Sequence, residues 1–262
     1  MQALDLELLR NAAMAAGEIA KRHFKRDVQT WTKDHDNSPV TAADLEIDAM
    51  LRQTLLGARP DYGWLSEETE DGRDRLDRHD VFIVDPIDGT RSFIAGQSNF
   101  SHSLAIARGG VIQVAVVHLP IKERTYWAVR GAGAFVNDTP LVASGAAQLE
   151  GADVLTAKVT LEAENWRTGT PPHFARHFRP SLAYRLALVA EARFDAMMTL
   201  RPTWEWDVAA GALLCEEAGA VVTDRLGGDA VFNNPHPMLR GLVAGPAGLH
   251  GQTLKALRPP RA

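Results

Sequence analysis

The chain has 262 residues, which is enough for one large domain or two smaller ones. Its 45% hydrophobic and 23% charged content is ordinary for a globular protein and excludes fibrous and disordered classes. The formal net charge is −5 at pH 7, and no run of Lys or Arg stands out. The sequence therefore predicts no nucleic-acid polymer and no acidic membrane surface as a partner.

The cellular compartment is indicated by the single cysteine and by the amino terminus. Cys215 has no second cysteine with which to form an intramolecular disulfide, which fits a reducing compartment. Residues 1–20 carry acids where a signal peptide has basic residues, and no uncharged run approaches the length of a membrane span. We expect a cytoplasmic protein without a membrane partner. A homodimer is compatible with the sequence, which gives no oligomeric state.

Two amphipathic helices are predicted at the start of the chain. Apolar residues recur at helical spacing up to Phe24, which predicts a helix over roughly residues 4–25. A second helix should open in the segment 40–48 and end near Gly57.

Asp44 has two interpretations. Thr41 and Asp44 have the spacing of a capping box, in which the two side chains satisfy free amides at the helix start. Alternatively, Asp44 orients a water at a neighbouring metal site. The local sequence favours the cap, and we expect that one carboxylate cannot serve both roles fully.

A buried strand precedes the predicted site. Residues 81–84 are β-prone and apolar, and the strand should end on Asp85 because Pro86 cannot continue a central ladder. Asp88 and Gly89 then supply turn chemistry.

Hard oxygen ligands are concentrated at the end of this strand. Asp85, Asp88, the Ile87 carbonyl and the Thr90 hydroxyl lie within six residues of sequence, a set that suits Mg²⁺ and hence a phosphorylated substrate. The alternative is an ordinary Asp-rich turn in which Asp88 bonds its own backbone.

Two further acidic stretches have structural alternatives. The run from Ser66 to Glu70 follows an apolar pair and reads locally as a short strand entering a solvated acidic loop, although one Glu can turn inward. Asp207 could simply cap a helix that Gly219 terminates. The small residues at 209–211 argue for a different role, because they let that helix end approach another backbone closely.

The remaining pattern predicts two halves. Residues 101–142 alternate strands with Gly and Asn-Asp turns, as in an antiparallel meander. The rest alternates strands and helices, which favours α/β layering; the strands are expected near 152–156, 195–200, 220–223 and 241–244, and the helices near 181–192, 207–218 and the end of the chain. We predict an α+β half, residues 1–145, with the antiparallel sheet and most metal ligands, and an α/β half, residues 146–262, with a mixed sheet and a substrate helix.

The order and spacing of four motifs resemble the inositol monophosphatase superfamily of Mg²⁺-dependent, lithium-sensitive phosphatases. The motifs are Val40-Thr41-Ala42-Ala43-Asp44, Ser66-Glu67-Glu68-Thr69, Asp85-Pro86-Ile87-Asp88-Gly89-Thr90 with Phe93, and Trp206-Asp207-Val208-Ala209-Ala210-Gly211. The resemblance covers nearly the whole chain. It implies a layered αβαβα sandwich that combines α+β and α/β features, two or three Mg²⁺ ions, and inhibition by Li⁺.

The resemblance also implies roles for individual residues. One Mg²⁺ is expected on Glu67, Asp85 and the Ile87 carbonyl, and a second on Asp85, Asp88 and Asp207. Asp44 and Thr90 are then expected to position a water for in-line attack. The amides of Gly89 and Thr90, at a helix start, are expected to receive the phosphate.

Substrate choice rests on a finer resemblance to the adenosine 3',5'-bisphosphate nucleotidase branch. Arg91 is basic as in that branch, and residues 181–191 look like its substrate helix, with Ser181 and Arg185 contacting substrate and Arg185 meeting a second phosphate. Alternatively, Arg185 lies on a solvated helix face. Ser92 stands where that branch usually has an acid.

We therefore expect a Mg²⁺-dependent phosphomonoester hydrolase. The preferred activity is that of a 3'(2'),5'-bisphosphate nucleotidase, which converts adenosine 3',5'-bisphosphate to AMP and phosphate. Inositol monophosphatase is one alternative, and histidinol-phosphate phosphatase, which residues 91–94 resemble, is another. A different class of protein, a non-catalytic binding or regulatory protein on the same fold, would be marked by loss of a metal ligand. All five expected acids are present, which favours the enzyme: Asp44, Glu67, Asp85, Asp88 and Asp207.

Overall fold

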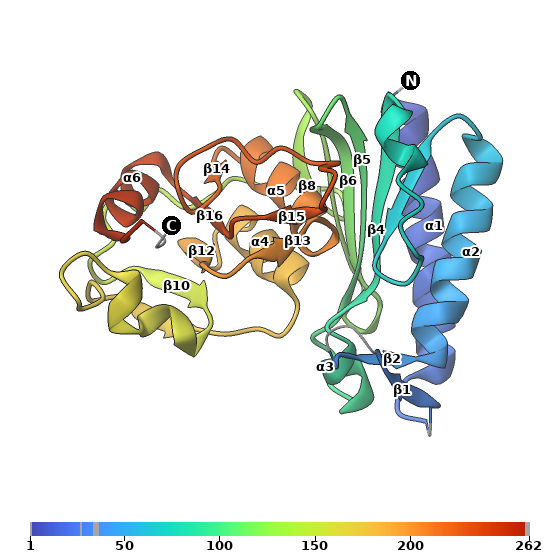
Figure 1. Cartoon of the computed structure of the whole chain (residues 1–262), viewed down its shortest axis with the longest axis horizontal. Coiled ribbons are helices and arrows are strands. Elements are labelled where there is room, and N and C mark those ends of the chain that lie inside the picture. Colours follow the sequence, from blue (N-terminus) through green and yellow to red (C-terminus); the bar gives the residue numbers. More distant parts are fainter. Residues whose placement is uncertain (1, 27, 34–36, 260–262) are drawn as a thin grey trace.

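The computed structural model describes residues 2–26, 28–33 and 37–259, which form five layers in the order helix, sheet, helix, sheet, helix (Figure 1). The helical layers are α1 (Gln2–His23) with α2 (Ala42–Ala58), then α4 (Leu182–Ala190) with α5 (Glu205–Glu217), then α6 (Ala247–Ala256). The predicted αβαβα sandwich is confirmed. Among the described residues, none of the helices combines the length and apolar character that a membrane crossing requires.

The larger sheet has seven strands in sequence order, and only its first pair is parallel. Its strands are β3 (Gly63–Ser66), β4 (Asp80–Asp88), β5 (Ser101–Arg108), β6 (Val111–Leu119), β7 (Arg124–Val129), β8 (Gly133–Val136) and β9 (Thr139–Pro140). Alternate residues of β4 enter different cores, because side chains of a strand point to opposite faces. Phe82 packs in the core that includes α1 and α2, and Ile83 in the core that includes α4 and α5. The predicted meander is confirmed.

The smaller sheet has five strands and mixed pairing. Their spatial order is β11 (Ala175–His177), β10 (Asp153–Thr156), β12 (Ala196–Thr199), β16 (Leu242–Gly245) and β14 (Val221–Thr223). Met197 faces the core with α4 and α5, while Met198 faces the core with α6. The larger sheet thus comes from residues 63–140 and the smaller from residues 153–245, and the predicted division into residues 1–145 and 146–262 stays a prediction.

Short elements connect the layers. Two small antiparallel pairs join β1 (Thr30–Thr32) to β2 (Pro39–Thr41) and β13 (Thr203–Trp204) to β15 (Met238–Leu239). Single turns of 3₁₀ helix are η1 (Asp74–Asp77), η2 (Pro120–Lys122), η3 (Lys158–Leu161) and η4 (Ala163–Asn165). The short helix α3 (Thr90–Ile94), β1 and β2 gather where β4 ends (Figure 1). These elements and β11 carry too few residues for a periodic sequence signal.

The structure corrects the predicted end of the strand that leads to the site. β4 continues through Pro86 to Asp88 instead of ending on Asp85. Proline is tolerated there because the pairing of β4 with β5 shifts register between Asp85 and Asp88, and a bulge needs no ladder bond from every residue. The first helix also ends earlier than predicted, at His23.

Close packing of α4 on α5 depends on Gly211. A Cβ on Gly211 would lie 2.5 Å from the Cβ of Leu186 in α4, a distance that packed atoms do not adopt. The small residue Gly211 therefore permits the close approach of α5 to α4, where it meets Leu186. Cys215, on the same helix, is buried.

Candidate active site

The bulge in β4 turns two acids toward one place. In a regular strand, residues three apart point to opposite faces, so Asp85 and Asp88 would diverge. The ladder with β5 skips a residue, however, since its last two pairs are Asp85 with Ser103 and Asp88 with Ser101. The extra residue restores a common direction, which is a frequent use of bulges beside active sites.

Asp207 joins these two acids from α5. Carboxylate oxygens of Asp85, Asp88 and Asp207 all lie within 4.8 Å of one another, a grouping that could hold a metal ion. Burial and the neighbouring carboxylates raise the pKa of Asp85 and the pKa of Asp207 well above their usual range. A bound cation would relieve this repulsion.

The capping role considered for Asp207 is wrong. α5 begins at Glu205, its N-cap is Trp204, and Asp207 lies inside the first turn. The start of the helix is instead fixed to β5, because the Ser103 hydroxyl donates to the Trp206 carbonyl at 3.0 Å. This contact sets Asp207 against the acids of β4.

Asp85 fits a hard metal ion on a second ground. The side chain is 1% exposed, and its Oδ1 is buried without a hydrogen-bond partner among the described residues. Buried polar atoms are nearly always partnered, so an unpartnered carboxylate oxygen facing other carboxylates calls for a cation. Oxygen donors of this type suit Mg²⁺. The Ile87 carbonyl lies in the same bulge and accepts a hydrogen bond from Thr90 Oγ1 at 3.2 Å.

Glu67 and Glu68 both turn inward after β3, so the predicted solvated loop is wrong for these two residues. Lys33 Nζ lies 2.7 Å from Glu67 Oε1 and 2.8 Å from Glu68 Oε1, and the Glu68 side chain is only 4% exposed. Burial alone would lower the pKa of Lys33, but the attraction of the two carboxylates outweighs it and raises that pKa. Burial and the charge of Glu67 raise the pKa of Glu68 to about 8. A lone lysine in a polar loop gives no sequence signal for this role.

The two oxygens of Asp44 have different partners. Oδ2 accepts from the Thr41 amide at 2.9 Å and from Thr41 Oγ1 at 2.5 Å, while Thr41 Oγ1 accepts from the Ala43 amide at 3.2 Å. The predicted capping box is therefore confirmed. Oδ1 accepts from Thr90 Oγ1 at 3.2 Å. Capping thus leaves Oδ1 directed at the site, and burial raises the pKa of Asp44 to about 6.

Gly89 allows the chain to turn from β4 into α3. Its φ of 102° lies in the left-handed region, and a Cβ there would come within 3.3 Å of the Asn99 carbonyl oxygen. The helix begins at Thr90, so the first amides of this turn have no partner within the helix. Arg91 follows on the exposed side.

Asp88 connects the end of β4 to the start of α4. Its Oδ2 accepts from Ser181 Oγ at 2.6 Å and from the Ala183 amide at 2.7 Å. The alternative in which Asp88 bonds its own turn is therefore wrong. Ser181 is the N-cap of α4, since its Oγ also accepts from the Tyr184 amide at 2.9 Å. Burial raises the pKa of Asp88 to about 6, although these hydrogen bonds oppose the rise.

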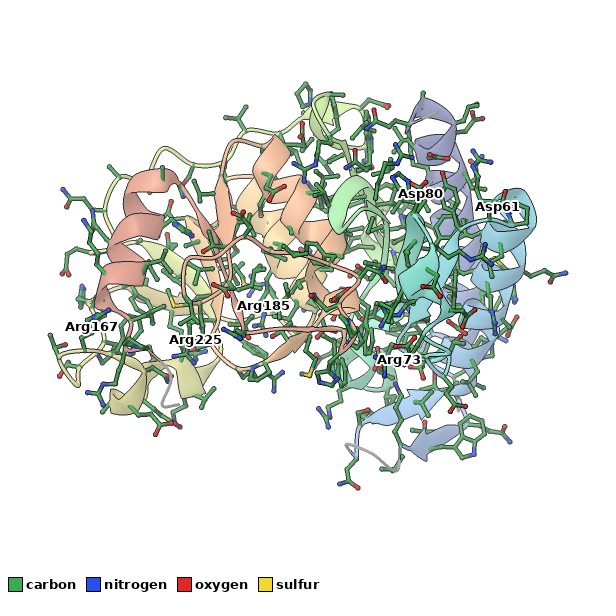
Figure 2. All side chains as sticks on the ribbon, turned by 45° about the horizontal axis from the view of Figure 1, so that its top comes forward. Asp61, Arg73, Asp80, Arg167, Arg185 and Arg225 are labelled. Carbon is green, nitrogen blue, oxygen red and sulfur yellow. The ribbon has the colours of Figure 1, made fainter. Side chains whose placement is uncertain are left out.

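Arg185 lies inside the molecule, and the solvated-face alternative is wrong. It is 5% exposed, its Nε donates to the Arg179 carbonyl at 2.5 Å, and its guanidinium lies 4.4 Å from the centre of the Phe178 ring. In Figure 2 Arg185 lies nearer the middle of the molecule than Arg167. Burial lowers the pKa of Arg185 to about 10, while the charges of Asp88 and Asp207 oppose that fall.

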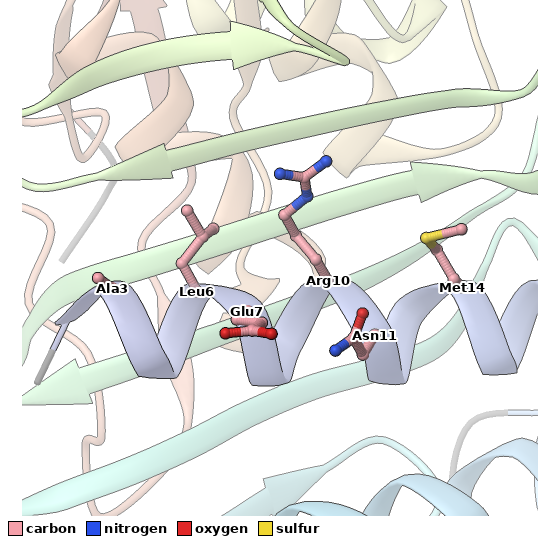
Figure 3. Close-up of a pocket in the computed structure, with 6 residues that line it drawn as sticks. All are labelled: Ala3, Leu6, Glu7, Arg10, Asn11 and Met14. Atoms are coloured by element: carbon pink, nitrogen blue, oxygen red, sulfur yellow. The ribbon is translucent and has the colours of Figure 1, made fainter.

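Two surface hollows lie away from these residues. One, of about 300 Å³, runs along α1, and Figure 3 shows Leu6, Arg10 and Met14 pointing to the same side of that helix. Arg10 there lies over the ring of Trp127 in β7. The other, of about 320 Å³, includes Gly109 and Gly110 after β5. Neither is lined by a residue of the predicted site.

Comparison with known proteins agrees with the fold. Residues 2–259 match the model of the inositol monophosphatase family. An inositol-1-monophosphatase of Rhizobium meliloti is 38% identical over 236 residues, which cover 85% of this chain and 86% of that protein. A histidinol-phosphatase of Chlorobaculum parvum is 31% identical over 255 residues, covering 92% and 95%.

Among solved structures, the extragenic suppressor protein suhB of Bartonella henselae superposes with a TM-score of 0.81. It is 29% identical, and the match covers 96% of this chain and 97% of that one. The family match spans nearly all described elements, and relatives at 30% identity or more cover most of the chain. This protein is therefore a phosphatase of the inositol monophosphatase family.

Proposed function

We propose that the site at the end of β4 hydrolyses phosphate monoesters with Mg²⁺ as cofactor. The observation that supports this most is the convergence of three carboxylates within 4.8 Å, one of which has a buried oxygen without a partner in the described chain. Asp85, Asp88 and Asp207 would hold one ion, and Glu67, Asp85 and the Ile87 carbonyl another. When bound, Mg²⁺ lowers the pKa of a water and neutralises charge on the transferred phosphoryl group.

The chain's own residues orient the reactants. Thr90 Oγ1 lies 3.2 Å from both Asp44 Oδ1 and the Ile87 carbonyl, so its proton can be directed to either acceptor. The bonds from Thr41 hold the Asp44 carboxylate in place, so little reorganisation is needed when it accepts a proton from the attacking water. The free amides of Gly89 and Thr90 donate to phosphate oxygens at the start of α3.

For the substrate we propose a nucleotide with two phosphates, best represented by adenosine 3',5'-bisphosphate. Of the three nitrogens in the Arg185 side chain, only Nε donates a hydrogen bond to a described residue. The two terminal nitrogens are therefore left for an anion. Arginine binds phosphate through such paired donors. Arg176 and Arg201 add positive potential around it. Arg91, exposed in α3, is a further proposed contact to phosphate.

Ser181 has a different proposed role from a substrate contact. Its hydroxyl is already engaged with Asp88, with the Tyr184 amide and, at 3.0 Å, with Ser101 Oγ. We propose that it fixes Asp88 in the metal site and acts on substrate only through that carboxylate.

Inositol monophosphate and histidinol phosphate are the second candidates. The name of the 38% identical relative favours the first, and the name of the 31% identical relative favours the other. Both substrates carry one phosphate, so neither would use a second anion site at Arg185. Inhibition by Li⁺ is also proposed, through competition for the Mg²⁺ carboxylates.

The experiment is a comparison of kcat/KM for adenosine 3',5'-bisphosphate, inositol 1-phosphate, histidinol phosphate and fructose bisphosphate, with Mg²⁺ and with a chelator. We expect Mg²⁺-dependent phosphate release and the highest efficiency with the nucleotide. Release from inositol 1-phosphate at higher efficiency would overturn the substrate proposal, and no release from any substrate would favour a non-catalytic protein.

A cytoplasmic location, a homodimer and the absence of a nucleic-acid partner stay predictions.

A further inference from the structure

His102 lies directly opposite the bulge in β4. The neighbouring residues Ser101 and Ser103 pair with Asp88 and Asp85, so Pro86 and Ile87 together face His102. His102 Nδ1 lies 2.5 Å from the Pro86 carbonyl oxygen. The ring therefore contacts the backbone of the short segment that carries the acids.

This contact fixes the protonation of the ring. A carbonyl oxygen only accepts hydrogen bonds, so Nδ1 must carry the proton. A second ring proton, on Nε2, would have no acceptor among the described residues, so the neutral ring with Nε2 unprotonated fits this buried place. Nε2 is buried, and no donor reaches it from the described residues.

The unpartnered Nε2 argues against a role in packing alone. The ring is 0% exposed and sits between Phe100, at 6.3 Å, and His118, at 6.0 Å between ring centres. An apolar side chain would fill this space without leaving a buried acceptor unpaired, which costs free energy. What the imidazole supplies, and an apolar side chain does not, is the donor to Pro86.

His102 supplies a donor to the carbonyl of Pro86 at the bulge. A bulge interrupts the hydrogen-bonded ladder between two strands. A buried carbonyl that has no partner in the ladder must accept a hydrogen bond from another group. The peptide unit that contains this oxygen joins Pro86 to Ile87, and it lies between Asp85 and Asp88. Its orientation restrains the backbone on the amino side of Ile87, and thereby limits the directions open to the Ile87 carbonyl and the spacing of the two carboxylates.

We propose that His102 is a positioning residue of the metal site: its Nδ1–H holds the Pro86 carbonyl and thereby keeps Asp85, the Ile87 carbonyl and Asp88 in metal-binding geometry. This inference rests on the proposed Mg²⁺ site. His102 would act only through the backbone of β4, without contact to the metal or the substrate.

Three substitutions separate this role from packing. In His102→Asn the side-chain amide nitrogen can occupy the place of Nδ1. In His102→Gln the amide nitrogen reaches the place of Nε2. In His102→Leu the side chain fills a similar volume but has no hydrogen-bond donor. His118→Leu serves as a control for packing, because the His118 ring stacks on His102 while its Nδ1 contacts Thr125 Oγ1 at 2.9 Å, on β7. The readout is Mg²⁺ affinity from calorimetry without substrate, beside the Mg²⁺ dependence of activity and the melting temperature without metal.

We expect Leu and Gln at position 102 to weaken Mg²⁺ binding by roughly ten- to a hundredfold, the usual effect of losing a residue that orients a metal ligand. His102→Asn should recover most of the affinity, and His118→Leu should retain it. Wild-type affinity in His102→Leu, or an equal loss in the Asn and Gln variants, would overturn the inference. If the wild-type protein itself does not bind Mg²⁺, the proposed function fails. If wild type binds Mg²⁺ and the variants at position 102 bind it equally well, only the inference about His102 fails.

Discussion

Two buried carboxylates near the start of α5 differ in how the chain treats them. Glu205 is 0% exposed, and it accepts hydrogen bonds from the Asn233 amide at 2.6 Å and from the amide and side chain of Asn234, each at 2.8 Å. Asp85 is as deeply buried, but its Oδ1 has no donor in the described chain and its neighbours are other acids. Glu205 thus fixes a loop, whereas Asp85 lies in a group of acids that could hold a metal ion. Burial alone does not identify a functional acid; missing partners do.

Asp85→Asn should have the largest effect on activity. The amide keeps the shape of the side chain but lacks the charge that would bridge two ions, so turnover should fall by more than roughly a thousandfold. The free energy of unfolding without metal should equal or exceed that of wild type, because a repelled buried charge is removed. Phosphate release and thermal melting measure both. Substantial Mg²⁺-dependent turnover in the folded variant would remove Asp85 from the metal site.

Asp44→Asn should separate capping from catalysis. Asp44 is the third residue of the capping box and accepts from the Thr41 amide; an Asn oxygen can accept the same hydrogen bond, so the melting temperature should stay near that of wild type. The substitution removes a proton acceptor next to Thr90, and we expect turnover to fall by roughly a hundredfold or more. If activity and stability both match wild type, Asp44 acts only as a cap.

Arg185→Ala should reveal the second anion site. We expect kcat/KM for adenosine 3',5'-bisphosphate to fall by about ten- to a hundredfold, the equivalent of about 1.5 to 3 kcal/mol for a lost charge-assisted hydrogen bond. Inositol 1-phosphate hydrolysis should change much less. Equal losses on both substrates would contradict recognition of a second phosphate.

Glu205→Gln should have the opposite signature to Asp85→Asn. An amide presents one acceptor where three donors now converge, so the free energy of unfolding should fall by roughly 1 to 3 kcal/mol. Turnover of the folded fraction should remain close to wild type, as checked by chemical denaturation beside an activity assay. A selective loss of turnover with unchanged stability would show that the contrast between the two acids is wrong.

Sequence patterns predicted the longer helices and strands, but not the contacts that hold the proposed ligand residues in place. The capping box of Asp44 and the meander are local patterns, and the structure confirms both. The continuation of β4 through Pro86 was missed because a bulge overrides the local rule for proline. Lys33 and His102 act across long separations in sequence, and a single polar residue carries no periodic signal for such a partner.

The pH dependence follows from the raised pKa values. In the metal-free folded chain the pKa of Asp88 is about 6, above its usual value, so between about pH 4 and pH 6 the folded state binds more protons than the unfolded state. The stability contributed by this group is therefore present at low pH and is lost as the pH rises through that window. Mg²⁺ needs the ionised carboxylates, so its stabilising effect should grow over the same range.

The most direct test of the metal site is the shift in melting temperature that Mg²⁺ produces in wild type and in Asp85→Asn, measured at about pH 8 and about pH 5. A ligand that binds only the folded state raises its stability. We predict a clear rise for wild type at the higher pH, a small one at the lower pH, and none for Asp85→Asn at either. An equal rise in both proteins would show that Mg²⁺ binds elsewhere and would contradict the account.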